Sequence, residues 1–217
     1  MTEPTFTYPW FPPLWNRLRA RFGAEARDGA HDLSHALRVA RNAESLAREG
    51  GANVEVCVAA ALLHDLVYLP KNHPDSPRTA VLGAREARAW CRDIPELAQR
   101  GETIAEAIAT HSFSGGASPT TQEGAVLQDA DRLEAIGAIG LARCFATGGA
   151  MRAGMWHSED PWAEHRTLDD KRFSLDHFEQ KLLGLAARMN TRAGLRHAKA
   201  RHRVLVDFLT ALRSELG

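Results

Sequence analysis

Apolar residues recur with a helical period in nearly every long segment of the chain. Ala, Leu, Arg and Glu dominate these segments, and no stretch shows the alternation of apolar and polar residues that is typical of a half-buried strand. The expected helices cover about residues 12–22, 32 or 34 to 49, 54–69, 77–92, 100–111, 121–145, 174–190 and 195–215. The sequence therefore predicts an all-α, single-domain bundle of about eight helices.

The ends of the second and third helices carry clear local signals. Asp32 and Ser34 are both suitable N-caps for the second helix, and Gly50-Gly51 is a suitable stop. The third helix is expected to start after Asn53 and to end before Pro70, because the residue before a proline disfavours helical backbone. Since it is apolar nearly all round, we expect it to be the central buried helix.

Composition and charge narrow the class of protein. The chain has 217 residues, with 27 Lys plus Arg against 27 Asp plus Glu, so no overall basicity points to a nucleic acid or a membrane. The N-terminus lacks the pattern of a secretory signal, and no apolar run approaches the roughly 20 residues that span a bilayer. The three cysteines are widely spaced and read as reduced thiols. A cytoplasmic protein is expected.

The stretch "AAALLHDLVYLP" places a histidine and a carboxylate, His64 and Asp65, inside an otherwise buried segment. Buried charge is costly unless it is paired or coordinates a metal. The pair also lies near the C-terminal end of its predicted helix, where the dipole disfavours a carboxylate. A bound cation would reverse both penalties. The alternative is a half-exposed Asp65 beside a core histidine whose hydrogen bonds are satisfied.

Further polar residues interrupt apolar faces elsewhere. His35 shares a helix face with Val39, Asn42 and Leu46, which directs its imidazole toward the core. Asp129 and Asp131 interrupt the apolar run "AVLQDADRLEAIGAIG", but residues two apart on a helix point about 200° apart, so only one can face a given site. Imidazoles and carboxylates together suit borderline to hard divalent metals.

A competing metal-binding pattern is present in "HDLSH", where His31 and His35 have the i, i+4 spacing by which a helix can present two histidines to one metal. An N-cap at Asp32 or Ser34 would leave His31 outside the helix. A role near the ligands or the substrate is therefore favoured for His31 over a role as a ligand.

The order of these motifs resembles the HD-domain superfamily of metal-dependent phosphohydrolases. "HALRVARNA", "LLHDL" and "DADRLEAIG" follow one another as in that all-α family, over about residues 20–145. "HDLVYLPKNHPDSPRTA" and "HSFSGG" are most similar to its small bacterial-type hydrolases, which include nucleotide-acting members. The C-terminal helices, at about 174–216, are expected to pack on or over the site.

The resemblance implies a set of four metal ligands, one of them supplied by the Ala-Asp-x-Leu context of the third motif. These ligands are His35, His64, Asp65 and Asp131. Asp129 then lies beside the ligands or on the helix surface. Because the matching region offers the single histidine His111 and no adjacent His-His pair, a mononuclear site is favoured. The metal is one divalent ion, and manganese, nickel, cobalt, iron, magnesium and zinc all stay open.

The reaction implied is hydrolysis by a metal-activated water, with Asp65 steering the proton of that water. His111 would protonate the leaving group or contact the ligands, although a helix C-terminal histidine is the simpler alternative. Lys71 and Arg78 follow the His-Asp pair and could bind phosphate, but Lys71 could equally be solvated and Arg78 could offset Asp75 or Glu86.

Several functional alternatives accompany this reading. The expected partner is a small phosphorylated molecule, in particular a nucleotide, and neither a nucleic acid polymer nor a membrane. The same pocket could instead hold a nucleotide as a sensor, without turnover. Oxidative di-iron chemistry would need further ligands. Residues 147–172 are expected to be irregular and could form a lid, and the basic cluster at 192–203 reads as a solvated face that could reach toward phosphates.

Overall fold

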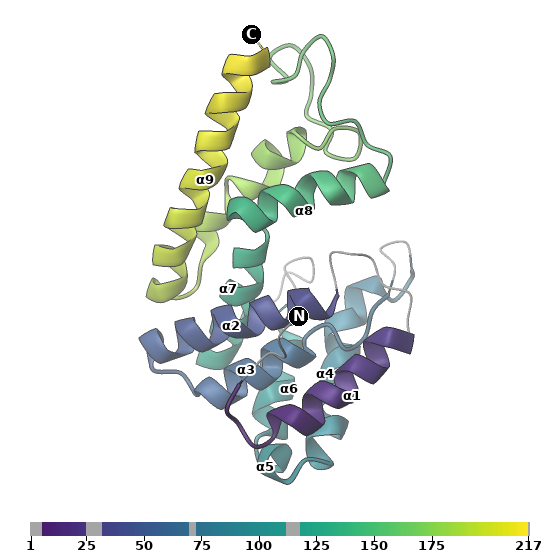
Figure 1. Ribbon diagram of the computed structural model, residues 1–217, viewed down its shortest axis with the longest axis vertical. Coiled ribbons are helices and arrows are strands. Elements are labelled where there is room, and N and C mark those ends of the chain that lie inside the picture. Colours follow the sequence, from purple (N-terminus) through teal and green to yellow (C-terminus); the bar gives the residue numbers. More distant parts are fainter. Residues whose placement is uncertain (1–5, 25–31, 70–72, 112–117, 217) are drawn as a thin grey trace. The chain divides into compact units, whose positions relative to one another are not determined.

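The computed structural model describes residues 6–24, 32–69, 73–111 and 118–216. Across these ranges it contains no β-strand, and Gly154 and Phe173 form an isolated bridge. The elements are α1 (Phe11–Ala24), α2 (Leu33–Gly50), α3 (Val54–Leu63), η1 (Ser76–Arg78), α4 (Thr79–Arg92), α5 (Pro95–Ala98), α6 (Gly101–Ala109), α7 (Gln122–Glu134), α8 (Gly137–Ala150), η2 (Phe178–Leu182), η3 (Leu185–Arg188) and α9 (Arg192–Leu216) (Figure 1). The all-α prediction is confirmed.

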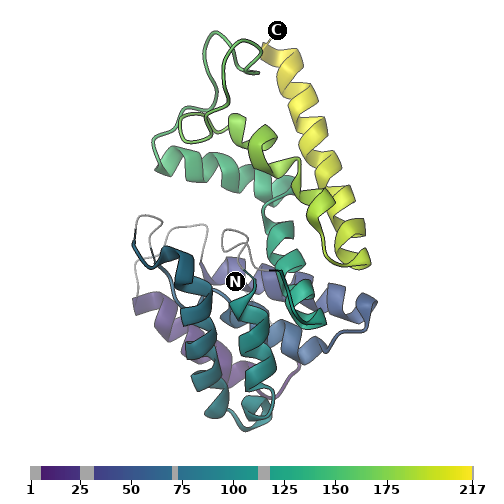
Figure 2. The same ribbon diagram turned by 180° about the vertical axis from the view of Figure 1, so that it is seen from behind.

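The chain divides into two compact units, an N-terminal unit of residues 1–131 and a C-terminal unit of residues 132–217, and the boundary falls within α7. In the N-terminal unit α3 packs against α2 and α6, and α4 packs along α6 (Figures 1 and 2). Every residue of α3 from Val56 to Leu63 is buried. The prediction of a central buried helix is confirmed, and each buried leucine contributes about 2 kcal/mol by removal from water.

The caps of α2 and α3 follow the sequence signals. Asp32 is the N-cap of α2, Gly51 ends the helix with a left-handed φ of 75°, and Asn53 caps α3 by accepting a hydrogen bond from Val56 N–H. The prediction that the third helix extends to residue 69 is wrong, because α3 ends at Leu63. A turn follows, in which the N–H of Leu66 donates a hydrogen bond to the carbonyl of Leu63. His64 and Asp65 therefore lie just beyond the helix end.

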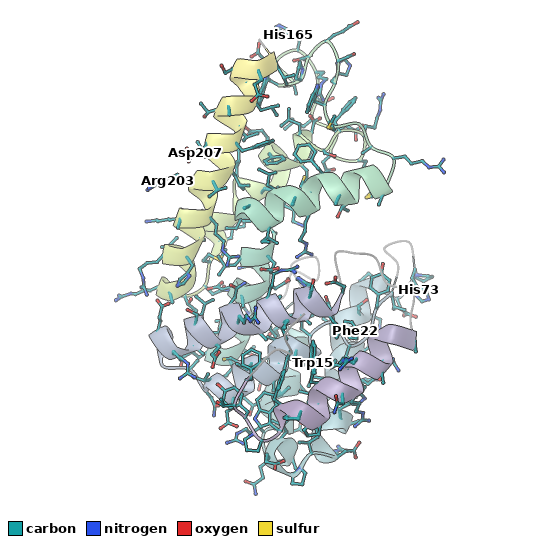
Figure 3. All side chains as sticks on the ribbon, in the orientation of Figure 1. Trp15, Phe22, His73, His165, Arg203 and Asp207 are labelled. Carbon is teal, nitrogen blue, oxygen red and sulfur yellow. The ribbon has the colours of Figure 1, made fainter. Side chains whose placement is uncertain are left out.

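The aromatic N-terminal segment packs on its own unit. Trp10 is fully buried, and its Nε1–H donates to Glu55 Oε2 at 2.8 Å, while the hydroxyl of Tyr8 donates to Glu44 Oε1 at 2.9 Å. On α1, Trp15 and Phe22 point toward the helices of the same unit (Figure 3). The N-terminus thus closes one side of the core that carries α3.

The long sixth helix predicted at 121–145 is wrong, because it is interrupted at Ala135 and Ile136. Gly137 has a positive φ of 75°, and the backbone of Ala135 approaches Gly140 so closely that a Cβ there would lie 2.2 Å from the Ala135 carbonyl carbon. Glycine is the residue that tolerates both conditions. The chain therefore turns between α7 and α8.

The C-terminal unit packs α8 on α9, and the regular helix predicted at 174–190 is wrong. A π-helical turn (η2) and a 3₁₀ turn (η3) occupy that range instead. On α9, Arg201 donates to the carbonyl of Leu133 at 2.5 Å, whereas Arg203 and Asp207 point outward (Figure 3).

Residues 151–177 contain little regular structure but are tied by side-chain hydrogen bonds. Arg166 donates to both carboxylate oxygens of Asp176, at 2.6 and 2.7 Å, and Asp160 accepts from two peptide N–H groups at 2.9 Å. Asp176 is 1% exposed and also accepts from the N–H of Asp169 at 2.6 Å. The irregular segment expected at 147–172 thus begins only after α8 ends at Ala150, and its role as a lid stays a prediction.

None of the helices in the described ranges is both long and apolar enough to cross a bilayer.

Candidate metal centre

The first residue of the candidate site, His35, is set in place by the cap of α2. Asp32 Oδ1 accepts from the N–H of His35 at 2.8 Å, which fixes the first turn of the helix. His35 is 1% exposed. The expectation that its imidazole faces the core is therefore confirmed by its burial.

His64 and Asp65 lie in the turn after α3, and the next residue, Leu66, is fully buried. His64 Nδ1 lies 2.7 Å from the carbonyl oxygen of Ala61 and must carry the proton to donate there. Its Nε2 then keeps a lone pair. This atom is buried and makes no hydrogen bond, although it lies 3.3 Å from Asp65 Oδ2.

Asp131 reaches the same point from α7. Its Oδ1 lies 3.5 Å from His35 Nε2 and 3.9 Å from His64 Nε2, and Asp65 Oδ2 lies 3.7 Å from His35 Nε2. Ligand atoms of His35, His64 and Asp131 all lie within 4.8 Å of one another. The structure thus brings together all four residues expected to hold a metal, and every one of them belongs to the N-terminal unit.

His111 joins the cluster from the end of α6. Its Nδ1 lies 2.6 Å from the carbonyl oxygen of Ile108, and its ring meets that of His64 edge-on with centroids 5.1 Å apart. Ligand atoms of His64, Asp65 and His111 form a second group within 4.8 Å. Burial lowers the pKa of His111, and the charge of His64 lowers it further. We call these five residues, His35, His64, Asp65, His111 and Asp131, the histidine–aspartate cluster.

The charged groups of the cluster shift the pKa values of one another. Burial by itself would lower the pKa of His64, but the nearby negative charge of Asp65 outweighs it, and together with the charge of Asp131 it raises this pKa to about 9. Burial would likewise raise the pKa of Asp131, but the hydrogen bond from His35 and the charges of His64 and His35 hold it well below its usual range. The carboxylates therefore attract a positive charge to this point.

A divalent cation fits this donor set. In the neutral rings, the two backbone contacts place the proton on Nδ1 and leave the Nε2 lone pairs of His64 and His111 for a metal, as is usual for metal-ligating histidines. On His64 a bound cation would replace the proton that the carboxylates favour. The buried Nε2 of His64, which makes no hydrogen bond, would gain the cation as its partner. Imidazole and carboxylate ligands without thiolate suit the first-row divalent ions and magnesium.

The structure does not bring the other predicted site residues that it describes into the cluster. Lys71 and His31 lie outside the described residues. Arg78 has a 63% exposed side chain that pairs with Asp75 at 3.1 Å, as the alternative reading anticipated. Asp129 is fully buried, so the alternative that placed it on the helix surface is wrong.

Two amide side chains for which the sequence predicted no role border the cluster, Asn42 on α2 and Gln128 on α7. Each donates to a peptide carbonyl next to a cluster residue. The signal available in the sequence was weak: each amide lies on the helix face of a predicted ligand, Asn42 two turns after His35 and Gln128 one turn before Asp131.

Comparison with known proteins identifies the family. The HD domain model matches residues 32–136, a range that contains the whole cluster. The Bacillus subtilis (strain 168) protein YpgQ is 31% identical over 190 residues, covering 86% of this chain and 84% of YpgQ. The chain belongs to the HD-domain superfamily. The resemblance seen in the sequence is therefore confirmed.

Solved structures extend the likeness of this HD protein to nearly its full length. The crystal structure of an HD-superfamily hydrolase from Bacillus thuringiensis matches with a TM-score of 0.72 and 31% identity, over 94% of this chain and 95% of that one. The crystal structure of Bacillus subtilis YpgQ in complex with ADP matches with a TM-score of 0.69 and 28% identity, over 92% and 96%. The fold is that of HD-superfamily hydrolases.

Proposed function

We propose that this HD protein is a metal-dependent phosphohydrolase that cleaves a phosphomonoester or phosphoanhydride bond of a nucleotide. The convergence of His35, His64, Asp65 and Asp131 on one point carries the proposal, with distances of 3.3–3.9 Å between their ligand atoms. Such a set holds a hydrolytic cation while leaving coordination positions for water and substrate.

The four residues would hold one divalent ion, which supplies an activated water and neutralises phosphoryl charge. Asp65, whose Oδ2 contacts both His64 and His35, is the residue we assign to accept the proton of the attacking water. For His111 the proposal keeps the two roles predicted from the sequence, which are protonation of the leaving group and contact with the ligands.

A nucleotide substrate is supported by the relative YpgQ, whose crystal structure is described as a complex with ADP. Phosphoryl transfer depends on charge neutralisation and positioning, so cations near the ligands are expected to bind the phosphates. Phosphate binding by Lys71 and Arg78 stays a prediction, and Arg78 would first have to leave Asp75.

The test is product formation by the metal-stripped full-length protein. Each of the six candidate metal ions would be added back with nucleoside mono-, di- and triphosphates, and released phosphate and pyrophosphate would be measured separately. Metal-dependent product that Asp65→Asn abolishes is the expected result. Stabilisation by nucleotide with no product would contradict hydrolysis and favour a sensor.

A further inference from the structure

Gln128 links the helix that carries Asp131 to the backbone that carries His111. It lies one turn before Asp131 on α7, is 3% exposed, and donates through Nε2 to the carbonyl of Thr110 at 3.2 Å. Thr110 ends α6 and directly precedes His111. Carbonyls at a helix C-terminus require partners from outside the helix, and Gln128 supplies one.

Asn42 forms a similar link between α2 and α7. It lies two turns after His35 on the same face of α2, and its Nδ2 donates to the carbonyl of Ala130 at 3.4 Å. That carbonyl belongs to the peptide unit that joins Ala130 to Asp131. Each amide thus bonds the peptide unit immediately before a residue of the histidine–aspartate cluster.

The two links connect the three helices that bring His35, Asp131 and His111 together. Replacing either amide by an apolar side chain would leave a carbonyl without this donor, at a cost of about 1–3 kcal/mol where the carbonyl is buried. The protein can recover part of that cost by shifting the peptide toward another donor. Any such shift would move the ligand beside it.

We propose that Asn42 and Gln128 are positioning residues that fix Asp131 and His111 at the distances needed to bind the metal. The inference rests on the metal site of the proposed function, but it does not depend on which bond is cleaved. Outer partners that orient ligands typically change metal affinity about 10- to 100-fold when removed.

The chain offers a control in Gln122, which is exposed whereas Gln128 is buried. It is also a glutamine of α7, and its Nε2 donates across to α2, to the carbonyl of Gly50 at 2.8 Å. It lies at the opposite end of α7 from Asp131, and its bond is next to no cluster residue. If joining two helices is all that these amides do, replacing Gln122 and replacing Gln128 should change the affinity for metal by the same factor.

The experiment compares Gln128→Met, Asn42→Leu and Gln122→Met with the wild type, all as full chains stripped of metal. The Mn²⁺ dissociation constant is measured calorimetrically, and the visible spectrum of the Co²⁺-loaded protein reports ligand geometry. We expect about tenfold weaker Mn²⁺ binding and an altered Co²⁺ spectrum for Gln128→Met and Asn42→Leu. Gln122→Met should bind within about twofold of the wild type and keep its spectrum.

The outcomes separate this inference from the proposed function. Wild-type affinity and spectrum in both Gln128→Met and Asn42→Leu, or equal losses in Gln122→Met, would overturn the positioning role even if the enzyme hydrolyses nucleotides. If the wild type binds Mn²⁺ but hydrolyses nothing, the proposed function fails and the affinities still decide the positioning role. Should Gln128→Met fail to fold, Asn42→Leu decides it against Gln122→Met.

Discussion

Two regions of the molecule gather polar side chains, and they do so in opposite ways. In residues 151–177 each buried acceptor faces a donor, as when Asp176 receives two hydrogen bonds from Arg166 and one from the N–H of Asp169. In the histidine–aspartate cluster, carboxylates face imidazoles, and the buried Nε2 of His64 makes no hydrogen bond.

The difference separates polar groups that stabilise the fold from polar groups to which we assign the binding of a metal. Paired groups fix the irregular chain because buried donors and acceptors satisfy one another. A cluster of lone pairs and negative charge is stable only with a positive charge among them. The contrast therefore predicts stability effects in the C-terminal unit and binding effects in the N-terminal unit.

The largest expected effect is the loss of activity in Asp65→Asn. Removing this carboxylate takes away a ligand and the proposed proton acceptor, so we expect metal-dependent hydrolysis to fall at least about 1000-fold. Circular dichroism should show that the variant stays folded. Activity within tenfold of the wild type would mean that the cluster is not catalytic.

Asp176→Ala should instead lower the free energy of unfolding by about 3 kcal/mol. The side chain of Arg166 is only 17% exposed, and the substitution removes its carboxylate partner. Urea unfolding measures this loss. Mn²⁺ binding should stay within about twofold of the wild type, because Asp176 contributes no ligand. A variant with wild-type stability would remove the contrast between the two regions.

The pH dependence of that loss sharpens the comparison. Although burial would raise the pKa of Asp176, hydrogen bonds from Arg166 and Asp169 lower it. The stabilisation is therefore complete above the unfolded carboxyl pKa of about 4 and is lost as pH falls through the lower folded pKa. Denaturation at several pH values should show the stabilities of Asp176→Ala and the wild type converging in acid, whereas a constant gap would exclude a charge effect.

The smallest expected effect concerns the turn between α7 and α8. Gly140→Ala places a Cβ 2.2 Å from the Ala135 backbone and should cost about 2 kcal/mol. Gly149→Ala, in the same helix, meets nothing within 4 Å and should stabilise the protein by about 0.5–1 kcal/mol. Thermal melting compares the two. Equal effects would show that the close approach of Ala135 does not govern this turn.

Local signals predicted the helix ends that side chains cap. Asp32, Gly51 and Asn53 act at the positions expected from sequence, and the identities of the four proposed ligands followed from motif order. The turn at Gly137 escaped prediction because its neighbours continue an apolar helical pattern, and the close approach of Ala135 to Gly140 depends on tertiary packing.

The residues that meet in the cluster could be predicted from the sequence, but the contacts that support them could not. A motif names His64, whereas its tautomer depends on the distance to the carbonyl of Ala61, which only the folded chain fixes. The link from Gln128 to Thr110 joins residues 18 apart in sequence across two helices, and no local pattern encodes it.

The most direct test of the central claim is a crystal structure of the protein loaded with Mn²⁺, with anomalous scattering used to locate the ion. The account predicts one ion per chain, bound by His35, His64, Asp65 and Asp131 at about 2.0–2.3 Å. An ion bound elsewhere, or an empty cluster at saturating Mn²⁺, would contradict it.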